Sequence, residues 1–262
     1  TLFRSGFGDD IGVDGDLDGE KSEKELSLYG NQTPYAENIV VTNCLLQSRS
    51  SGVRVGYGRQ PIRNCIFSNL VIYGSNRGLG IFARDGAPIE NIYFHDIIIR
   101  NRIHSGHWWG NGEPIHISSV PQHEETPGGK IKNIRLHNIT AESETGILIW
   151  GNPTDRIHKV QLHNIDLHIK KSPLADYYGG NVDLRPALRQ KDRIFSFDLP
   201  GIYAQHTDQL SLRDFHLSWD PDVADYHTHG LYLKDVDGFY RDDQSIFPAR
   251  PGSGLQDIKI EP

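Results

Sequence analysis

The chain contains no methionine and only two cysteines, and its basic residues are outnumbered by its acidic ones, 27 against 34. Two cysteines cannot build a disulfide framework. A net charge of −7 argues against a general nucleic-acid binder, although a local basic cleft stays compatible with it. With 37% hydrophobic and 23% charged residues, the composition excludes disordered, collagenous and membrane-spanning proteins. We therefore expect a soluble globular protein that binds neither nucleic acid nor a membrane.

Helical periodicity longer than two turns is absent as well, and the chain carries a strand repeat instead. Each copy alternates apolar and polar residues, then has Asn or Asp followed by a further apolar residue. The copies lie at 39–44, 65–70, 92–97, 134–139, 160–165, 210–215 and 231–236, and an eighth begins at 258. Their Asn or Asp positions are 26, 27, 42, 26, 50 and 21 residues apart. The short spacings are typical of one coil of a parallel β-solenoid, and the two long ones indicate inserted loops.

A second set of alternating strands, at 53–55, 79–81, 115–117 and 147–149, lies between these copies. Asn and Asp suit the bends between strands because they tolerate the left-handed backbone conformation. The sequence therefore predicts an all-β protein, a single-stranded right-handed parallel β-helix that forms one domain over residues 1–262.

Two residue types inside the repeat have ordinary interpretations. His95, His137 and His163 share one place in their coils, but other copies have Thr, Ser, Arg or Lys there. We interpret them as part of an outward-facing polar stripe rather than a metal ladder. Cys44 and Cys65 fall at different places in their coils and are expected to be buried thiols.

Three segments resemble a known family. They are the Gly-Asp-Asp turn with its strand at 8–13, the Asn-Ile-x-Val-x-Asn-Cys strand at 38–44, and Arg-Gly-Leu-Gly-Ile-Phe at 77–82. Residues 1–120 thereby resemble glycoside hydrolase family 28, the polygalacturonase group of pectin-lyase-like β-helices. The resemblance implies inverting hydrolysis of a glycosidic bond with Asp9 and Asp10 as catalytic carboxylates. It also places one family turn before Thr1, so we expect the chain to be the C-terminal part of a longer solenoid.

Two departures from the family pattern indicate a divergent member with another substrate. Residues 50–52, Ser-Ser-Gly, stand where the family has Gly-His-Gly. Gly80 and Phe82 stand where it has a substrate-binding Arg and Lys.

Strand alternation also predicts a site without reference to the family. It turns five residues outward in successive coils of the second strand set, namely Gly12, Arg54, Gly80, His116 and Leu148. The turns that enter these strands carry Asp9 and Asp10 in the first coil and Glu113 in a later one. Inverting glycosidases need two carboxyl groups roughly 6.5–9.5 Å apart, a distance that coils stacked about 4.8 Å apart can supply. We therefore expect Asp9, Asp10 and Glu113 to be catalytic carboxylates.

A glycine-rich stretch at 102–116 contains His107, Trp108 and Trp109 and ends at His116. Aromatic faces stack on sugar rings, and binding residues concentrate on loops of rigid scaffolds. We expect these four residues to bind substrate, with a capping loop over the solenoid side as the alternative.

Arg54, Arg77 and Arg84 are further candidates for binding substrate. Arginine binds a carboxylate or sulfate on a sugar through two parallel hydrogen bonds. The alternative for them is solvated surface charge.

Asp14, Asp16, Asp18 and Glu25 match the spacing of a calcium loop, Asp-x-Asp-x-Asp-Gly-x5-Glu, with a solvated acidic loop as the alternative. The stretch 226–229 has metal-like His spacing without an identifiable third ligand. A Tyr- and Gly-rich segment at 177–186 suits either the far wall of a cleft or a protective loop.

The sequence thus predicts an extracellular or periplasmic, bacterial glycoside hydrolase acting on an acidic or substituted, pectin-like polysaccharide. No cofactor is required, and calcium is the one candidate ligand. Two alternatives stay open. One is a polysaccharide lyase in which calcium neutralises a uronate and Arg54 or Arg77 is the base. The other is a non-catalytic glycan-binding β-helix.

Overall fold

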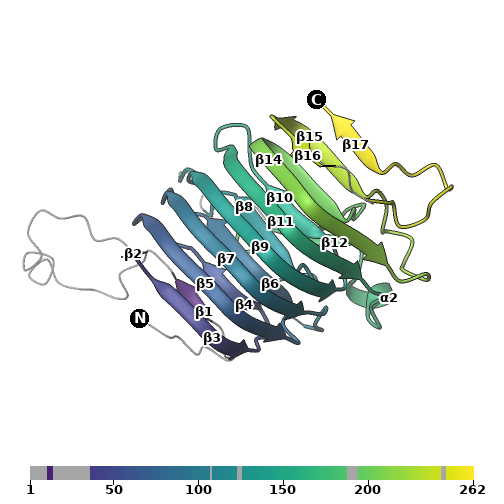
Figure 1. The fold of residues 1–262 in the computed structure, drawn as a ribbon, viewed down its shortest axis with the longest axis horizontal. Helices are drawn as coiled ribbons and strands as arrows, with labels where there is room; N and C mark the ends of the chain where they lie inside the picture. The colour runs from purple at the N-terminus through teal and green to yellow at the C-terminus, as the bar shows by residue number, and fades with distance from the viewer. Residues whose placement is uncertain (1–10, 14–35, 107, 123–125, 188–193, 243–245) are drawn as a thin grey trace, which may run out of the picture.

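The computed structural model describes residues 11–13, 36–106, 108–122, 126–187, 194–242 and 246–262 of the chain. Strands dominate the described residues, and they stack side by side along the long axis of the molecule (Figure 1). The strands are β1 (Ile11–Val13), β2 (Ala36–Glu37), β3 (Val40–Leu46), β4 (Ser51–Val55), β5 (Ile62–Tyr73), β6 (Arg77–Ala83), β7 (Ile89–Arg100), β8 (Ile115–Ser119), β9 (Ile131–Ser143), β10 (Ile147–Trp150), β11 (Ile157–Ile169), β12 (Asn181–Asp183), β13 (Ile194–Ser196), β14 (Ile202–Trp219), β15 (Leu231–Asp237), β16 (Tyr240–Arg241) and β17 (Ile258–Glu261).

The strands form two parallel columns. The first column contains the second strand set of the sequence analysis, and the second column contains most of the repeat copies. The first column runs β1, β4, β6, β8, β10 and the start of β14, then continues through β15 to β17. The second runs from β2 and β3 through β5, β7, β9 and β11 to the rest of β14 and β16. Among the described strands, every pairing in both columns is parallel, and the small β12–β13 pair is antiparallel. The predicted all-β parallel β-helix is confirmed.

Two repeat copies were assigned to the wrong column. Leu231 pairs with Ile202 and Ile258 pairs with Leu231, so these segments continue the first column. The error arises because the chain bends after a first-column strand too. His206 and Asp235, at these bends, both have positive φ. An apolar–polar alternation followed by Asp therefore occurs in both columns and does not distinguish them.

Asparagine ladders mark the bends of the second column, as predicted. Asn38, Asn64, Asn91 and Asn133 all have φ between 56° and 58°. Their side chains donate from coil to coil, with amide distances of 3.3, 3.1 and 2.7 Å. A second ladder of positive-φ residues comprises Asn43, Asn69, Asp96, Asn138, Asn164 and Asp214. The Asn and Asp residues at these bends thus adopt the positive φ that the bend requires, and in the first ladder their amides also bond from coil to coil.

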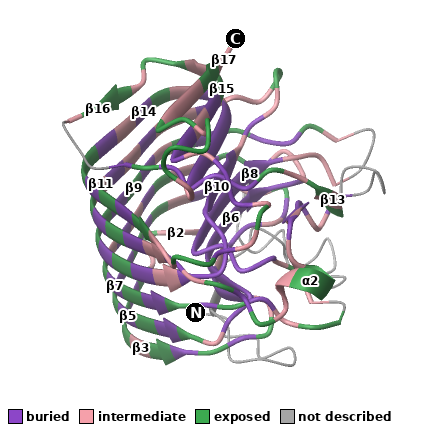
Figure 2. Ribbon diagram, turned by 90° about the vertical axis from the view of Figure 1, so that its right-hand side faces the viewer, coloured by how far each residue is buried: buried purple, intermediate pink, exposed green. Residues whose placement is uncertain are grey.

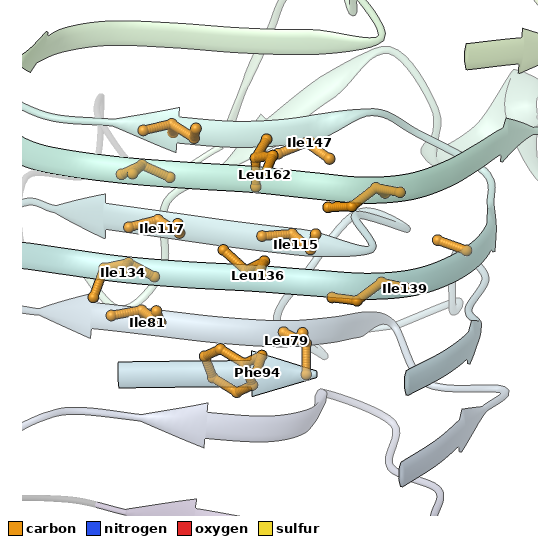
Figure 3. Close-up of a cluster of buried hydrophobic side chains, with 14 of the residues drawn as sticks. Leu79, Ile81, Phe94, Ile115, Ile117, Ile134, Leu136, Ile139, Ile147 and Leu162 are labelled. Carbon is orange, nitrogen blue, oxygen red and sulfur yellow. The ribbon is translucent and has the colours of Figure 1, made fainter. Parts of the chain in front are cut away.

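The core lies between the two columns and consists of stacked aliphatic residues, with Phe67 and Phe94 stacked 4.8 Å apart. Figure 3 shows first-column side chains such as Ile115 and Ile117 meeting second-column side chains such as Leu136. Along each of the long strands of the second column, residues that are buried and residues that are exposed alternate (Figure 2). Both cysteines are free thiols. Cys65 is buried as predicted, whereas Cys44 is only half-buried.

Helix is scarce in the described part of the chain. Its helix α2 (Ala175–Tyr178) lies beside the solenoid in the segment between β11 and β14 (Figure 2). Within the ranges described, the structure contains no helix long and apolar enough to cross a membrane.

Candidate functional site

The predicted outward-facing column exists, but most of it is covered. Register places Gly12, Arg54, Gly80, His116 and Leu148 side by side in successive coils, as expected. Arg54 is half-buried, whereas His116 and Leu148 are only 0% and 4% exposed. Among these five positions, Arg54 is the accessible side chain that the structure describes, and Tyr232 and Lys259, at the same position in β15 and β17, are half-buried as well.

Part of the cover is the segment 181–187, which we call the strap. It lies between β11 and β14 in sequence and carries β12. Val182 and Leu184 of the strap form a second apolar cluster with Leu148 on the outside of the solenoid. The predicted 177–186 segment therefore acts in part as a covering loop.

A buried aromatic ring replaces the polar side chains expected near Gly80. A Cβ atom on Gly80 would lie only 2.4 Å from Phe82 Cε2, so the Phe82 ring lies directly over this glycine. The guanidinium carbons of Arg77 and Arg84 are each 5.1 Å from the ring centroid. His116 meets the ring in an edge contact, with centroids 5.1 Å apart. Two cations and one imidazole thus surround one buried ring.

A continuous hydrogen-bond chain runs through this buried region. Arg84 Nη2 donates to Ser118 Oγ at 2.8 Å, and Ser118 Oγ lies 2.8 Å from His116 Nε2. His116 Nδ1 lies 3.3 Å from Glu113 Oε1, while the Asn111 N–H donates to Glu113 Oε2 at 2.6 Å. Because arginine can only donate, the Ser118 hydroxyl proton goes to His116 Nε2, which leaves the imidazole proton on Nδ1 facing Glu113.

Burial and neighbouring charge determine the ionisation of these groups. Burial alone would raise the pKa of Glu113, but the Arg77 charge and the hydrogen bonds from His116 and Asn111 outweigh it and lower that pKa to about 2. Burial, with the Arg77 charge, lowers the pKa of His116 to about 4. At neutral pH, Glu113 is therefore ionised and His116 is neutral. A general acid needs a raised pKa, so this environment does not favour that role for Glu113.

The two buried arginines bind the protein itself rather than solvent. Arg77 is 1% exposed, with Nε 3.6 Å from Glu113 Oε1 and Nη2 3.8 Å from Asp183 Oδ1. Its guanidinium also donates to the backbone carbonyls of Asp183 and Arg185. Arg84 donates to the strap carbonyl of Leu184 at 3.2 Å, and burial lowers its pKa to about 9. Neither predicted sugar-binding arginine reaches the surface, because the strap covers both.

The strap also holds the loop that carries the two tryptophans, residues 104–112, here called the tryptophan loop. Asp183 Oδ2 accepts the Gly110 N–H at 2.6 Å, and Arg185 Nη2 donates to the Trp108 carbonyl at 2.8 Å. Gly110 has φ +117°, and a Cβ atom there would lie 2.8 Å from Arg77 Cγ. Glycine is therefore required at this crossing of loop and solenoid.

Trp109 and Arg49 are exposed, and Arg54, Tyr57 and Trp108 beside them are half-buried. We use the name aromatic–basic surface for Arg49, Arg54, Tyr57, Trp108 and Trp109. Trp109 is 37% exposed and meets the Tyr57 ring edge-on at 6.3 Å. The Arg54 guanidinium carbon lies 4.6 Å from the Tyr57 centroid, and that of exposed Arg49 lies 5.4 Å from the Trp108 centroid. This surface combines aromatic faces with positive charge beside β4, the strand that pairs with β1.

Several predicted site residues lie outside the described residues. They are Asp9, Asp10, His107, Asp14, Asp16, Asp18 and Glu25. Asp10 directly precedes β1 in the sequence, and Ile11 of β1 pairs with Val53 of β4.

The described residues contain no group of three or more His, Cys, Asp and Glu side chains arranged to hold a metal ion. His95, His137 and His163 do stack in register on the second column. His95 Nδ1 lies 2.7 Å from Asp96 Oδ2, and His163 Nε2 lies 3.1 Å from Ser211 Oγ. These contacts agree with the polar-stripe interpretation.

Sequence reasoning did not identify Tyr57, Ser118 or Asn111 as parts of the site. An Asp/Arg pair was visible at 183 and 185, but nothing in its local pattern revealed its contact with Arg77, more than 100 residues away. Comparisons of the chain with protein-family models, with curated proteins and with solved structures gave no match. A functional assignment therefore rests on the site geometry and on the resemblance of residues 1–120.

Proposed function

We propose that this chain is a glycoside hydrolase that binds an acidic or substituted, pectin-like polysaccharide on the aromatic–basic surface, outside the cytoplasm. The observation that carries the proposal is the grouping of Trp109, Tyr57 and Arg54 beside β4, next to the covered positions Gly80, His116 and Leu148. Aromatic faces supply contact area for sugar rings, and guanidinium groups supply partners for carboxylate or sulfate substituents.

The catalytic carboxylates in this proposal are Asp9 and Asp10. They immediately precede β1, whose partner strand β4 carries Arg54 of the aromatic–basic surface. Glu113 is enclosed and ionised, so we propose a structural role for it as the fixed partner of Arg77 and the acceptor for His116.

Activity is tested on a panel of acidic and neutral polysaccharides. Hydrolysis releases reducing ends without an unsaturated product, whereas a lyase produces ultraviolet absorbance from a new double bond. Asp10→Asn should abolish turnover and retain glycan binding. Unchanged turnover in Asp10→Asn would remove that residue from the mechanism.

Binding is tested separately with Trp109→Ala. Truncating a tryptophan central to an interface costs more than about 1 kcal/mol, so affinity should fall at least about fivefold. Tyr240→Ala is the matched control, since this exposed ring also carries an arginine, Arg213, 5.1 Å from its centroid but lies on the distant strand β16. Equal losses in both variants would contradict a specific surface at Trp109.

A non-catalytic glycan-binding β-helix is the second candidate. The enclosure of Glu113 favours it, because one of the three predicted catalytic carboxylates is then not available to a bound sugar. Binding without turnover across the panel would select this candidate. The lyase alternative loses Arg77 as a possible base, since that side chain is 1% exposed, and retains Arg54.

A further inference from the structure

We propose that Asp183 and Arg185 are positioning residues that fix the tryptophan loop in the orientation in which it binds the glycan. The inference deepens the proposed function and depends on it for the identity of the ligand class. We call the ion pair of Asp183 and Arg185 the clasp.

The Asp183 carboxylate is saturated by hydrogen bonds from two segments. Oδ1 accepts from the Arg185 backbone N–H and from Arg185 Nε, both at 2.9 Å. Oδ2 accepts from Arg185 Nη2 at 2.8 Å and from the Gly110 N–H at 2.6 Å. The Asp183 side chain is 2% exposed. A buried carboxylate with four donors has one orientation, so it determines where the Gly110 backbone lies.

Arg185 extends the same contact to the tryptophans. Its Nη2 donates to Asp183 Oδ2 and also to the Trp108 carbonyl at 2.8 Å. The planar guanidinium can serve both acceptors at once, whereas a lysine ammonium is a point charge on a flexible stem. The clasp therefore contacts the backbone on both sides of Trp109.

The other anchors of the tryptophan loop lie mostly at its two ends, where His104, Asn111 and Gly112 bond to the solenoid. Gly106, Gly110 and Gly112 all have positive φ, and the described residues between 101 and 114 form no strand. Its remaining anchors to the solenoid include Asn76 Nδ2 to the Gly110 carbonyl at 2.9 Å and Ser50 Oγ to the Trp109 carbonyl at 3.3 Å. A loop with three such glycines has many alternative conformations, which the clasp removes before a ligand arrives. Because the other anchors persist, loss of the clasp should loosen the loop without unfolding the coils.

The test uses Arg185→Lys and Asp183→Asn in protein labelled with 5-fluorotryptophan, whose four residues give four fluorine resonances that Trp→Phe variants assign. Both variants should shift or broaden the Trp108 and Trp109 resonances and leave that of Trp219 in place, since its ring contacts His227 and the Phe247 carbonyl rather than the strap. Affinity for a glycan bound by the wild type should fall about tenfold, which equals about 1.4 kcal/mol. In a hydrolase, KM should rise with kcat nearly unchanged.

Arg250→Lys is the matched control. Arg250 also donates to several backbone carbonyls, those of Ala224, Asp225 and His227, but it lies in the C-terminal coils away from the tryptophan loop. The control should change neither the Trp108 and Trp109 resonances nor glycan affinity.

Two results would overturn the inference. One is that the Trp108 and Trp109 resonances stay in place in both variants. The other is that they move while the affinity for the glycan does not change. If the wild type binds no glycan of the panel, the proposed function fails, and the fluorine spectra alone still decide whether the clasp positions the loop.

Discussion

Acid should destabilise this protein through two buried histidines well before its carboxylates are protonated. Burial lowers the pKa of His116 to about 4, with the Arg77 charge adding to the effect, and burial lowers that of His227 to about 4. An unfolded chain protonates histidine near pH 6.5. Between about pH 6.5 and pH 4, the unfolded state therefore binds one more proton per histidine than the folded state, and falling pH favours unfolding.

The magnitude follows from the two pKa values. Each such histidine lowers the unfolding free energy by about 1.4 kcal/mol per pH unit within this window. From pH 7 to pH 5 the two together should cost about 4 kcal/mol, a large share of the 5–15 kcal/mol typical of a folded domain. Glu113 acts in a lower window. Its lowered pKa gives stability that is present above about pH 4.5 and is lost as pH falls toward 2.

Urea unfolding at pH 7, 6 and 5 and constant ionic strength, followed by tryptophan fluorescence, measures this dependence. His116→Gln should remove about half of the slope between pH 6.5 and 5, even if it lowers stability at pH 7. The reasoning would be refuted by a wild-type loss below about 1 kcal/mol from pH 7 to pH 5, or by a variant that keeps the full slope.

Three further substitutions test other parts of the fold. Glu113→Gln should lower the unfolding free energy by about 3 kcal/mol because it removes the nearer of the two carboxylates that neutralise the buried Arg77, whereas Glu142→Gln, which breaks a surface pair, should cost at most about 1 kcal/mol in the same urea titration. Asn91→Ala should cost about 2 kcal/mol, and Asn91→Gly less, since glycine keeps the positive φ; equal losses would contradict a backbone contribution. Phe94→Ala should cost about 3–5 kcal/mol by leaving a cavity beside Phe67, and a melting temperature within two degrees of wild type would contradict tight stacking there.

The architecture was predictable from local pattern because each coil carries its own copy of the strand-and-bend repeat. Alternation identified both strand columns and the register of Arg54, Gly80 and His116 across coils. The Asn bends were predictable because a left-handed backbone conformation restricts the choice of residue. Leu231 was assigned to the wrong column because the alternating pattern describes a single strand and bend. The pattern carries no information on which column that strand joins.

The site was less predictable because its burial depends on contacts between distant segments. Nothing within residues 77–84 indicates that the carbonyls of Asp183, Leu184 and Arg185 would enclose Arg77 and Arg84. Strand alternation predicted that the His116 side chain points outward, away from the solenoid core. It does so, but the strap and the Phe82 ring bury it. A residue's direction follows from the period of its strand, whereas its exposure depends on what the inserted loops cover.

The strap also changes how the solenoid should respond to force. In a stack of coils where each contacts only its neighbours, stability is a sum of nearest-neighbour terms, and the array can peel from either end one coil at a time. Here the segment between β11 and β14 binds Arg77 at the start of β6, several coils earlier in the stack. When coils detach from the C-terminal end, the strap must leave Arg77 at the same time as the coil that carries the strap. When coils detach from the N-terminal end, the strap contacts break only when β6 is reached. The two ends of an otherwise one-dimensional array should therefore differ mechanically, and we expect the coils between β6 and β14 to rupture together rather than one at a time.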